Sequence, residues 1–418
     1  MTRREDMSKP EITIVRLRRA RKSVKLQRPK NRALDFWRGE FYQYIAQRLW
    51  RRCVTFQFLG YSILRPPSFS LCVTLLSAAL TPAIVLAQPQ IASINDLAQS
   101  LIDDTTPGIG VLVTNDGEVL HIAGYGAADI ESETPVTPQS IFDLASVSKE
   151  MTALAARMQI EAGLYTQETP ITDILPALAA IDSPRPLVVA DLLFHMSGLP
   201  DYLEWEGYIT ETTNAEILEW LVEQELDHAP GVQFEYSNTG FLVLGSVVAA
   251  AEDAEDLAQV LEARVWGPLG MSDTALPDSA DPNRRVTGYD GTGGDFDVAM
   301  EPSVAQGDGN VFSTLTDLAA YEAALVGDDL LGDTEALFIE GRLDDGKFVR
   351  DEDDIGYGYG WQVYEADGES FAAHSGSWMG TSTYYLRNLT TGVSVILLAN
   401  GQAADLWELA EEIEATVE

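Results

Sequence analysis

The chain of 418 residues is poor in cysteine, histidine and lysine, and each shortage excludes a class of site. Both cysteines, Cys53 and Cys72, precede residue 88, so the rest of the chain can hold neither a disulfide framework nor a cysteine-based metal site. The four histidines show no HExxH or similar ligand spacing: His121, His195, His228 and His374. We therefore expect no metal and no other cofactor.

Positive charge is also scarce outside the N-terminal segment. Residues 1–65 hold 17 of the 27 Lys+Arg and 5 of the 65 Asp+Glu, which leaves 10 basic and 60 acidic residues for the body, a net charge of about −50. Nucleic acid and anionic lipid would repel such a body, so we expect neither as a partner. An acidic surface is typical of a protein that works in salt, and a patch for a cationic partner is the alternative.

The front of the chain resembles an export signal. No charged residue lies between Arg65 and Asp96, and the apolar run 71–80 is followed by Val85 and Ala87, small residues suited to cleavage after Ala87. The pattern predicts a signal peptide at 66–87. An uncleaved anchor, the one membrane contact that we expect, is the alternative, because about 20 apolar residues can span a bilayer. Either way the body would be exported, to the periplasm or the outside.

Two further segments complete the predicted organisation. Residues 1–65 form a basic extension, which would be absent if translation starts downstream. Residues 91–418 form one catalytic domain, with strands predicted near both of its ends and helices between them. The predicted strands are 108–114, 118–125, 358–364, 370–374, 382–387 and 393–399, and the predicted helices are 94–102, 146–163, 187–195, 213–226, 239–266 and 403–416. This order predicts an α+β fold, an antiparallel sheet built from both ends of the body, flanked by helices, with an inserted, mainly helical subdomain.

The first motif that carries chemistry is Ser146-Val147-Ser148-Lys149. On a helix, a spacing of three places Ser146 and Lys149 side by side, and a deprotonated lysine can take the hydroxyl proton of a serine nucleophile. Four-residue patterns arise by chance, and a lysine on a solvated helix surface is the alternative. The body, however, has only two lysines, Lys149 and Lys347, and one of them lies here.

Two more motifs are weak when each is taken alone. Tyr236-Ser237-Asn238 offers a phenol that can carry a proton and an amide that can hold a carbonyl, although a packed turn tyrosine explains it equally well. His374-Ser375-Gly376-Ser377 ends a predicted strand, where its glycine permits close backbone approach; a histidine at a strand edge is the alternative.

Together the three motifs resemble the serine β-lactamase and penicillin-binding-protein family, in the class C-like branch that includes D,D-peptidases, esterases and D-aminopeptidases. The resemblance covers about 91–415 and includes four further segments: 191–202 (DLLFHMSGLPDY), 234–240 (FEYSNTG), 268–271 (PLGM) and 307–309 (GDG). It implies a β-lactamase/transpeptidase-like fold and an acyl substrate that is a small molecule or a peptide.

The resemblance also implies a role for each site residue. Ser146 would be the acylated nucleophile, with Lys149 and Tyr236 sharing the general base and acid roles. The substrate-binding residues would be Asn238, His374, Ser375, Gly376 and Ser377, and the backbone N–H groups of Ser146 and Ser377 would form the oxyanion hole.

The third motif departs from the family pattern, because His374 stands where many β-lactamases have the lysine of a Lys-Thr-Gly motif. A neutral histidine gives no fixed charge for a substrate carboxylate. We therefore expect a serine hydrolase acting on esters or amides, with a β-lactamase or D,D-carboxypeptidase as the alternative. A catalytically silent sensor domain on the same fold is the non-enzyme alternative. An α/β-hydrolase would need a Gly-x-Ser-x-Gly elbow, and the chain has none.

Overall fold

The computed structural model describes residues 88–102, 106–277, 279–292, 294–299, 301–327, 330–401 and 406–417. The predicted basic extension (1–65) and the predicted leader (66–87) lie outside these residues and stay predictions. Within the described ranges, no helix combines the length and the apolar character that crossing a bilayer requires.

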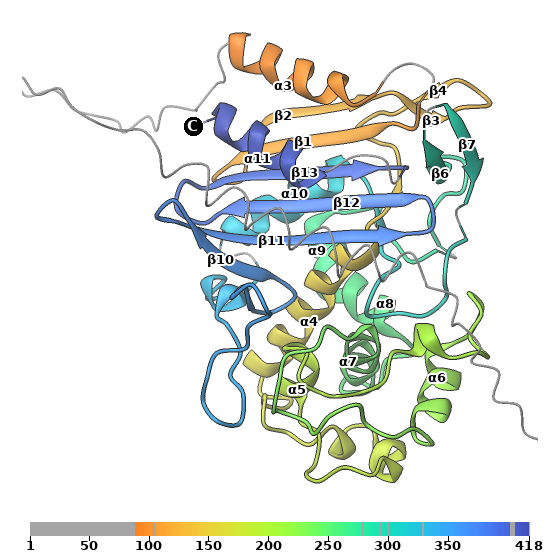
Figure 1. Cartoon of the computed structure of the whole chain (residues 1–418), viewed down its shortest axis with the longest axis vertical. Coiled ribbons are helices and arrows are strands. Elements are labelled where there is room, and N and C mark those ends of the chain that lie inside the picture. Colours follow the sequence, from red (N-terminus) through yellow and green to blue (C-terminus); the bar gives the residue numbers. More distant parts are fainter. Residues whose placement is uncertain are drawn as a thin grey trace, which may run out of the picture. The chain divides into compact units, whose positions relative to one another are not determined.

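The described residues form the following elements (Figure 1). The strands are β1 (Ile109–Asn115), β2 (Glu118–Tyr125), β3 (Ala127–Asp129), β4 (Thr134–Pro135), β5 (Phe142–Asp143), β6 (Tyr289–Thr292), β7 (Asp295–Val298), β8 (Phe312–Ser313), β9 (Gly356–Tyr357), β10 (Gln362–Ala366), β11 (Glu369–Trp378), β12 (Thr381–Asn388) and β13 (Val393–Ala399). The α-helices are α3 (Gln88–Ser100), α4 (Lys149–Glu161), α5 (Val189–Leu193), α6 (Asn214–Leu221), α7 (Asn238–Ala250), α8 (Leu257–Leu261), α9 (Gly267–Leu269), α10 (Leu315–Val326) and α11 (Leu406–Val417). Shorter helical turns are η1 (Ala145–Ser148), η2 (Ile171–Asp173), η3 (Pro176–Ala180), η4 (Tyr202–Glu204), η5 (Glu262–Trp266) and η6 (Glu335–Phe338).

One antiparallel sheet of seven strands forms the frame, in the order β2-β1-β13-β12-β11-β10-β9. Strand β1 comes from the start of the body and pairs with β13 from its end, with Ile109 opposite Ala399. Its other edge pairs with β2 through a tight turn, in which Asp116 and Gly117 have φ angles of 47° and 76°. Two consecutive residues with positive φ angles suit a two-residue hairpin turn, and glycine adopts such an angle without steric cost. The predicted sheet, built from both ends of the body, is confirmed.

Helices cover both faces of this sheet. Figure 1 shows α3 and α11 across one face, with α10 behind the other. Strand β1 alternates between the two layers: Val111 and Val113 join the hydrophobic cluster that contains Ile94 of α3 and Ile413 of α11, whereas Leu112 joins the main core on the opposite face. Burying each of these side chains stabilises the fold by about 1.5–3 kcal/mol.

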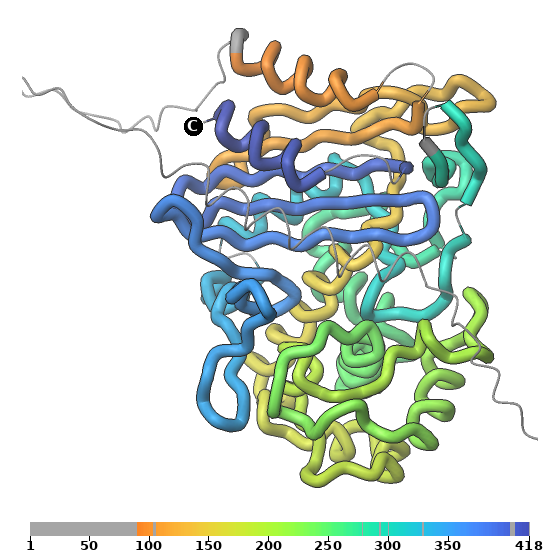
Figure 2. The backbone as a smooth tube through the Cα atoms, viewed as in Figure 1, coloured from red at the N-terminus to blue at the C-terminus, as the bar shows by residue number. Residues whose placement is uncertain are grey.

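The mainly helical part is inserted between two short strands. Strands β5 and β8 pair with each other, so the chain leaves the sheet region at 143 and returns at 312. The tube in Figure 2 shows most of the intervening segment as a separate layer below the sheet. Because α4 packs against α7 and η1 packs against β11 and β12, the junction of the two layers lies at the start of α4.

Two predicted elements are interrupted in the structure, and one hairpin was missed. The predicted strand 358–364 is interrupted, because Gly360 has a φ of +79°, and a Cβ there would lie 2.8 Å from the carbonyl oxygen of Lys149. The predicted helix 239–266 breaks after α7, and Asp256 starts α8 by accepting a hydrogen bond from the Gln259 N–H. The hairpin of β6 and β7 was not predicted.

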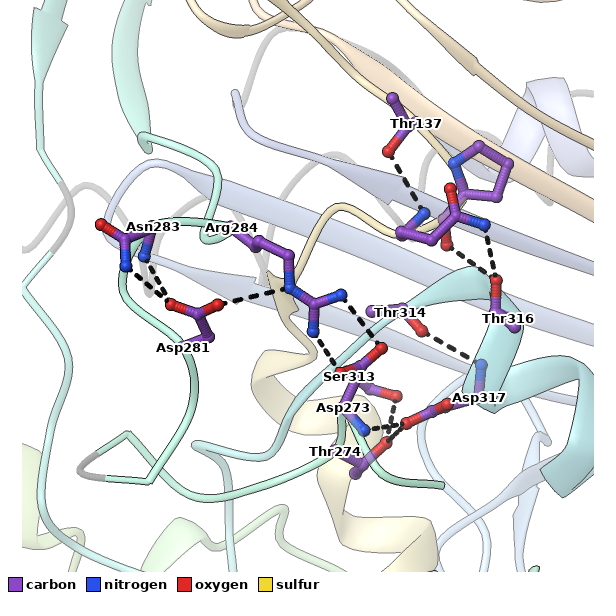
Figure 3. Close-up of polar contacts among 12 residues, drawn as sticks. Thr137, Asp273, Thr274, Asp281, Asn283, Arg284, Ser313, Thr314, Thr316 and Asp317 are labelled. Atoms are coloured by element: carbon purple, nitrogen blue, oxygen red, sulfur yellow. Dashed lines mark hydrogen bonds and ion pairs between the residues drawn. The ribbon is translucent and has the colours of Figure 1, made fainter. Parts of the chain in front are cut away.

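A set of polar contacts fastens the segment 273–284 to the start of α10 (Figure 3). We call its members the α10 cap cluster: Asp273, Thr274, Arg284, Ser313 and Asp317. One carboxylate oxygen of Asp317 accepts hydrogen bonds from the Asp273 N–H and the Thr274 hydroxyl, both at 2.8 Å. Arg284 forms ion pairs with Asp273 and with Asp281 outside the cluster.

Candidate active site

The serine of the first motif lies on a strained turn at the end of β5. Ala145 has a φ of +48°, which is uncommon for a residue with a side chain. The Asp143 carboxylate supports this conformation by accepting a hydrogen bond from the Ala145 N–H at 2.8 Å. Ser146 follows in η1 and is half-buried, while Ala145 and Val147 beside it are buried. The helix predicted for 146–163 is therefore an α-helix only from Lys149, and the turn presents the Ser146 hydroxyl at its start.

The sheet holds this turn from the other side. Thr383 of β12 donates a hydrogen bond to the carbonyl oxygen of Leu144 at 2.8 Å. A Cβ on Gly376 of β11 would lie 2.6 Å from the same carbonyl oxygen. Only glycine therefore lets β11 lie this close to the serine turn, and the third motif meets the first through its backbone. Ser375 and Ser377, on either side of Gly376, are half-buried.

Lys149 joins the first motif to the second. Its side chain is fully buried, and Nζ donates hydrogen bonds to the Ser146 Oγ at 3.2 Å, to the Asn238 Oδ1 at 3.0 Å and to the backbone carbonyl oxygen of Asp308. Nζ thus contacts three polar partners from three separate segments of the chain. Asn238 is the first residue of α7, whose N-cap Ser237 accepts a hydrogen bond from the Gly240 N–H at 2.9 Å.

Tyr236 forms the exposed wall of the site. Its side chain is 39% exposed, and its ring centroid lies 5.0 Å from the Lys149 Nζ. The rings of His195 and His374 lie 4.4 Å and 6.1 Å from the Tyr236 ring. The structure thus places the Lys149 Nζ between the Ser146 hydroxyl and the ring of Tyr236.

The His374 side chain is buried, and both of its ring nitrogens form hydrogen bonds within the protein. Its Nδ1 lies 2.7 Å from the carbonyl oxygen of Ser375, which can only accept, so Nδ1 carries the proton. Its Nε2 then accepts from the Tyr357 hydroxyl at 3.0 Å. Burial, together with the charge of Lys149, lowers the pKa of His374 to about 3, so the ring is neutral near pH 7. Neither ring nitrogen is left for a substrate.

Two aspartates beside the site were not predicted. Asp201 accepts a hydrogen bond from the Asn238 amide at 3.3 Å, and burial raises its pKa to about 6, with the charge of Asp308 acting in the same direction. Asp308 is buried, and its Oδ2 accepts from the Tyr202 hydroxyl at 2.9 Å. Its Oδ1 has no hydrogen-bond partner among the described residues. Both aspartates lie in segments that carry the family resemblance, but their types and spacing indicate no role.

This arrangement suits covalent catalysis by a serine. A half-buried hydroxyl lies next to a buried lysine, which in turn contacts a tyrosine ring and an amide, and the backbone of β11 packs against the serine turn. No group of three or more His, Cys, Asp or Glu in the described ranges could hold a metal ion.

Comparisons with known proteins agree with this chemistry. Residues 94–416 match the beta-lactamase family model. The chain is 28% identical to penicillin-binding protein 4* of Bacillus subtilis over 72% of its own length and 69% of that protein. It is 25% identical to a D-aminopeptidase of Gluconobacter oxydans over 71% of the chain, and it spans only 56% of that enzyme. It is 33% identical to esterase EstB of Burkholderia gladioli over 46% of the chain and 52% of the esterase.

A solved structure shows the same fold. The octameric penicillin-binding protein homologue from Pyrococcus abyssi superposes with a TM-score of 0.66 at 22% identity, covering 78% of this chain and 76% of that one.

Proposed function

Because the chain belongs to the beta-lactamase family, and is thus a serine hydrolase that acts through an acyl-enzyme on ester or amide bonds, we propose that it prefers substrates without a carboxylate, and that Ser146 is its nucleophile. The observation that carries this proposal is the state of His374, a neutral ring with both nitrogens bound inside the protein.

In the proposed mechanism, the Ser146 Oγ attacks the substrate carbonyl carbon while Lys149 and Tyr236 take up its proton. Backbone N–H groups of Ser146 and Ser377 stabilise the oxyanion of the tetrahedral intermediate. The C–O or C–N bond then breaks, the leaving group receives the proton, and Ser146 remains acylated. In the second half of the cycle, water attacks the acyl carbon and gives up a proton to the Lys149–Tyr236 pair. The bond from that carbon to the Ser146 Oγ then breaks, the carboxylic acid leaves, and the Oγ receives the proton. The 3.2 Å contact between the Lys149 Nζ and the Ser146 Oγ supports this route.

The surrounding charges disfavour a carboxylate substrate. Without a cation in the third motif, a carboxylate loses a charge-assisted hydrogen bond of about 1.5–3 kcal/mol. Two arginines of the body pair with glutamates instead of a substrate, Arg387 with Glu322 at 3.2 Å and Arg350 with Glu340 at 2.7 Å. β-Lactams and D-Ala-D-Ala peptides both carry a carboxylate, so both are expected to be poor substrates.

A second candidate is hydrolysis of amides or esters that bear a free amine. Asp201 borders Asn238, where a substrate would lie, and is separated from Lys149 only by that amide. An ionised Asp201 could pair with a substrate ammonium group. The similarity to a D-aminopeptidase adds support.

The test is labelling with a fluorophosphonate probe, read by mass spectrometry, followed by kinetics on matched substrates. We expect the adduct on Ser146, and less than about 1% of the activity in Ser146→Ala. Phenyl acetate and 3-acetoxybenzoate differ only in a carboxylate, so kcat/KM should be higher for the neutral ester. A carboxylate ester that reacts as fast as the neutral ester, or faster, would refute the substrate proposal, and an adduct on another residue would refute the nucleophile. D-Alanine p-nitroanilide, compared with its N-acetyl derivative, tests the second candidate.

A further inference from the structure

His195 occupies a strained, fully buried position beside the proposed active site. It follows the short helix α5 (Val189–Leu193) and has a φ of +54°. A non-glycine residue in this left-handed conformation costs about 1–3 kcal/mol and persists only where its surroundings hold it in place. Its exposed fraction is zero. The proposed roles of Ser146, Lys149 and Tyr236 make no use of this side chain.

The contacts of His195 bracket Tyr236. The backbone carbonyl oxygen of His195 accepts a hydrogen bond from the Glu235 N–H at 2.8 Å. Its ring Nδ1 accepts another from the Ser237 N–H at 3.0 Å. Its ring centroid lies 4.4 Å from the Tyr236 centroid, with 34° between the planes. One residue therefore fixes the backbone on both sides of Tyr236 and supports its ring from one face.

Tyr236 needs such support because it belongs to neither a helix nor a strand. It precedes α7 (Asn238–Ala250), which begins two residues later. Its side chain is partly exposed, so packing restrains it less than it restrains the buried Lys149. A displacement of about 1 Å at a reacting group can cost about 100-fold in rate.

The chemistry of the imidazole matches this task. Because Nδ1 accepts from a backbone N–H, the neutral ring carries its proton on Nε2, which is buried without a hydrogen-bond partner among the described residues. The aromatic rings of Phe234, Phe241 and Tyr357 lie 5.8, 4.9 and 4.5 Å from the His195 ring. Burial, followed by the charge of Lys149, lowers the pKa of His195 well below its ordinary value. The ring thus stays neutral, and Nδ1 stays an acceptor.

We propose that His195 is a positioning residue for Tyr236, which holds the phenol at the distance from Ser146 and Lys149 that proton transfer requires. The inference rests on the proposed function, because it gives Tyr236 a part in the chemistry. Histidine suits the position because it combines a ring that supports Tyr236 with an acceptor for the Ser237 N–H. Phenylalanine would keep the ring alone, and asparagine the acceptor alone.

A role in core packing alone would give a different result. Loss of packing lowers stability, and with it the amount of folded enzyme, but leaves kcat per folded molecule nearly unchanged. Loss of positioning lowers kcat in the folded enzyme and leaves KM nearly unchanged, since the other substrate contacts remain. The effect should also disappear when the Tyr236 hydroxyl has already been removed.

The experiment is a double-mutant cycle of His195→Phe with Tyr236→Phe, using p-nitrophenyl butyrate and active-site titration. We expect His195→Phe to lower kcat by about 10–100-fold with KM within about threefold, and to cost less than about threefold in the Tyr236→Phe background. His195→Asn, which keeps an acceptor and tolerates the left-handed backbone, should retain at least five times the kcat of His195→Phe. His121→Phe is the matched control on β2, away from the site, and should leave kcat within about twofold.

Three results decide the inference. Equal losses from His195→Phe in both backgrounds would overturn it, as would a kcat per folded molecule that does not change. If His195→Phe does not fold, His195→Gly replaces it in the same double-mutant cycle. Glycine adopts the positive φ angle readily and removes both the ring and the acceptor. If the wild type is active and labelled at Ser146, but His195→Phe lowers kcat equally in both backgrounds, this inference alone is refuted. A wild type without labelling at Ser146 refutes the proposed function, and this inference with it.

Discussion

The α10 cap cluster and the active site are both built from polar side chains of distant segments, but they treat those side chains differently. In the cap cluster, Asp317 receives two hydrogen bonds, and Arg284 pairs with carboxylates (Figure 3). Around Ser146, by contrast, the Asp308 Oδ1 and the His195 Nε2 are buried without partners among the described residues. Polar groups that serve stability are usually satisfied, whereas unsatisfied ones need another explanation.

Backbone strain follows the same division. Three residues near the active site have side chains and positive φ angles: Ala145 at 48°, His195 at 54° and Asn310 at 69°. The cap cluster contains none. The comparison teaches that the surroundings of the proposed site hold strained backbone and buried polar atoms without partners, neither of which occurs in the cap cluster, as expected for a functional site.

The largest effect should come from changing the buried cation. Lys149→Arg should lower kcat/KM by about 1,000-fold or more, because guanidinium does not release its proton and does not fit the three acceptors of Lys149. The other lysine of the body gives the matched control: Lys347 is exposed and pairs with Asp345, so Lys347→Arg should leave kcat/KM unchanged. Steady-state kinetics on a neutral ester measure both. An active Lys149→Arg enzyme would contradict the comparison of the two regions, because the buried Lys149 would then have a structural role, as the cap cluster does.

A smaller effect is expected from the carboxyl group under the serine turn. Burial raises the pKa of Asp143 from 3.8 to about 7, so the folded state holds this proton more tightly than the unfolded state. Its contribution to stability is therefore present below about pH 4 and is lost as the pH rises through 7, by at most about 4 kcal/mol. Asp143→Asn keeps an acceptor for the Ala145 N–H and should reduce the fall in Tm between pH 5 and pH 8. Asp116→Asn, in the β1–β2 turn, serves as the control. An unchanged pH dependence of Tm would contradict the expectation.

In the cap cluster we expect a loss of stability with no loss of turnover. Asp317→Ala leaves the Asp273 N–H and the Thr274 hydroxyl without this acceptor and should lower the free energy of unfolding by about 1–3 kcal/mol. Urea unfolding measures this value, and kcat per folded molecule should stay within about twofold of the wild type. A tenfold fall in kcat would show that the two regions are coupled.

The smallest effect should come from the ion pairs of the cap cluster. The Arg284 side chain is 36% exposed, so solvent screens its contacts with Asp273 and Asp281. Arg284→Met should cost at most about 1 kcal/mol, and the difference from the wild type should shrink in about 1 M NaCl. A loss that persists in high salt would show that packing of the side chain, rather than its charge, matters.

Much of the fold could be predicted, because its signals are local. The Asn115-Asp116-Gly117 turn, the apolar strands and the spacing of Ser146 and Lys149 depend on residues close together in the sequence. The proximity of Asn238 and Gly376 to Ser146 could be expected only from the family resemblance, since the segments are far apart in the chain.

The rest depends on tertiary contacts that no local pattern records. Asp308 is one acidic residue among many in the sequence, and only its burial beside Lys149 sets it apart. His195 could equally be a core histidine until its contacts on both sides of Tyr236 are seen. The interrupted strand at Gly360 was mispredicted for the same reason, because the turn fits against α4 rather than against its own neighbours.

The pairing of β1 with β13 has a consequence for the order of folding. Ile109 and Ala399 are about 290 residues apart, so the centre of the sheet cannot close during synthesis until nearly the whole chain has left the ribosome. The entropy of closing so long a loop grows only slowly with length, but contacts of this separation delay folding. β13 also pairs with β12, so a chain that ends before β13 would lack the strand that joins the two parts of the sheet. A nascent chain of this topology therefore cannot complete its central sheet until its last strand has been made.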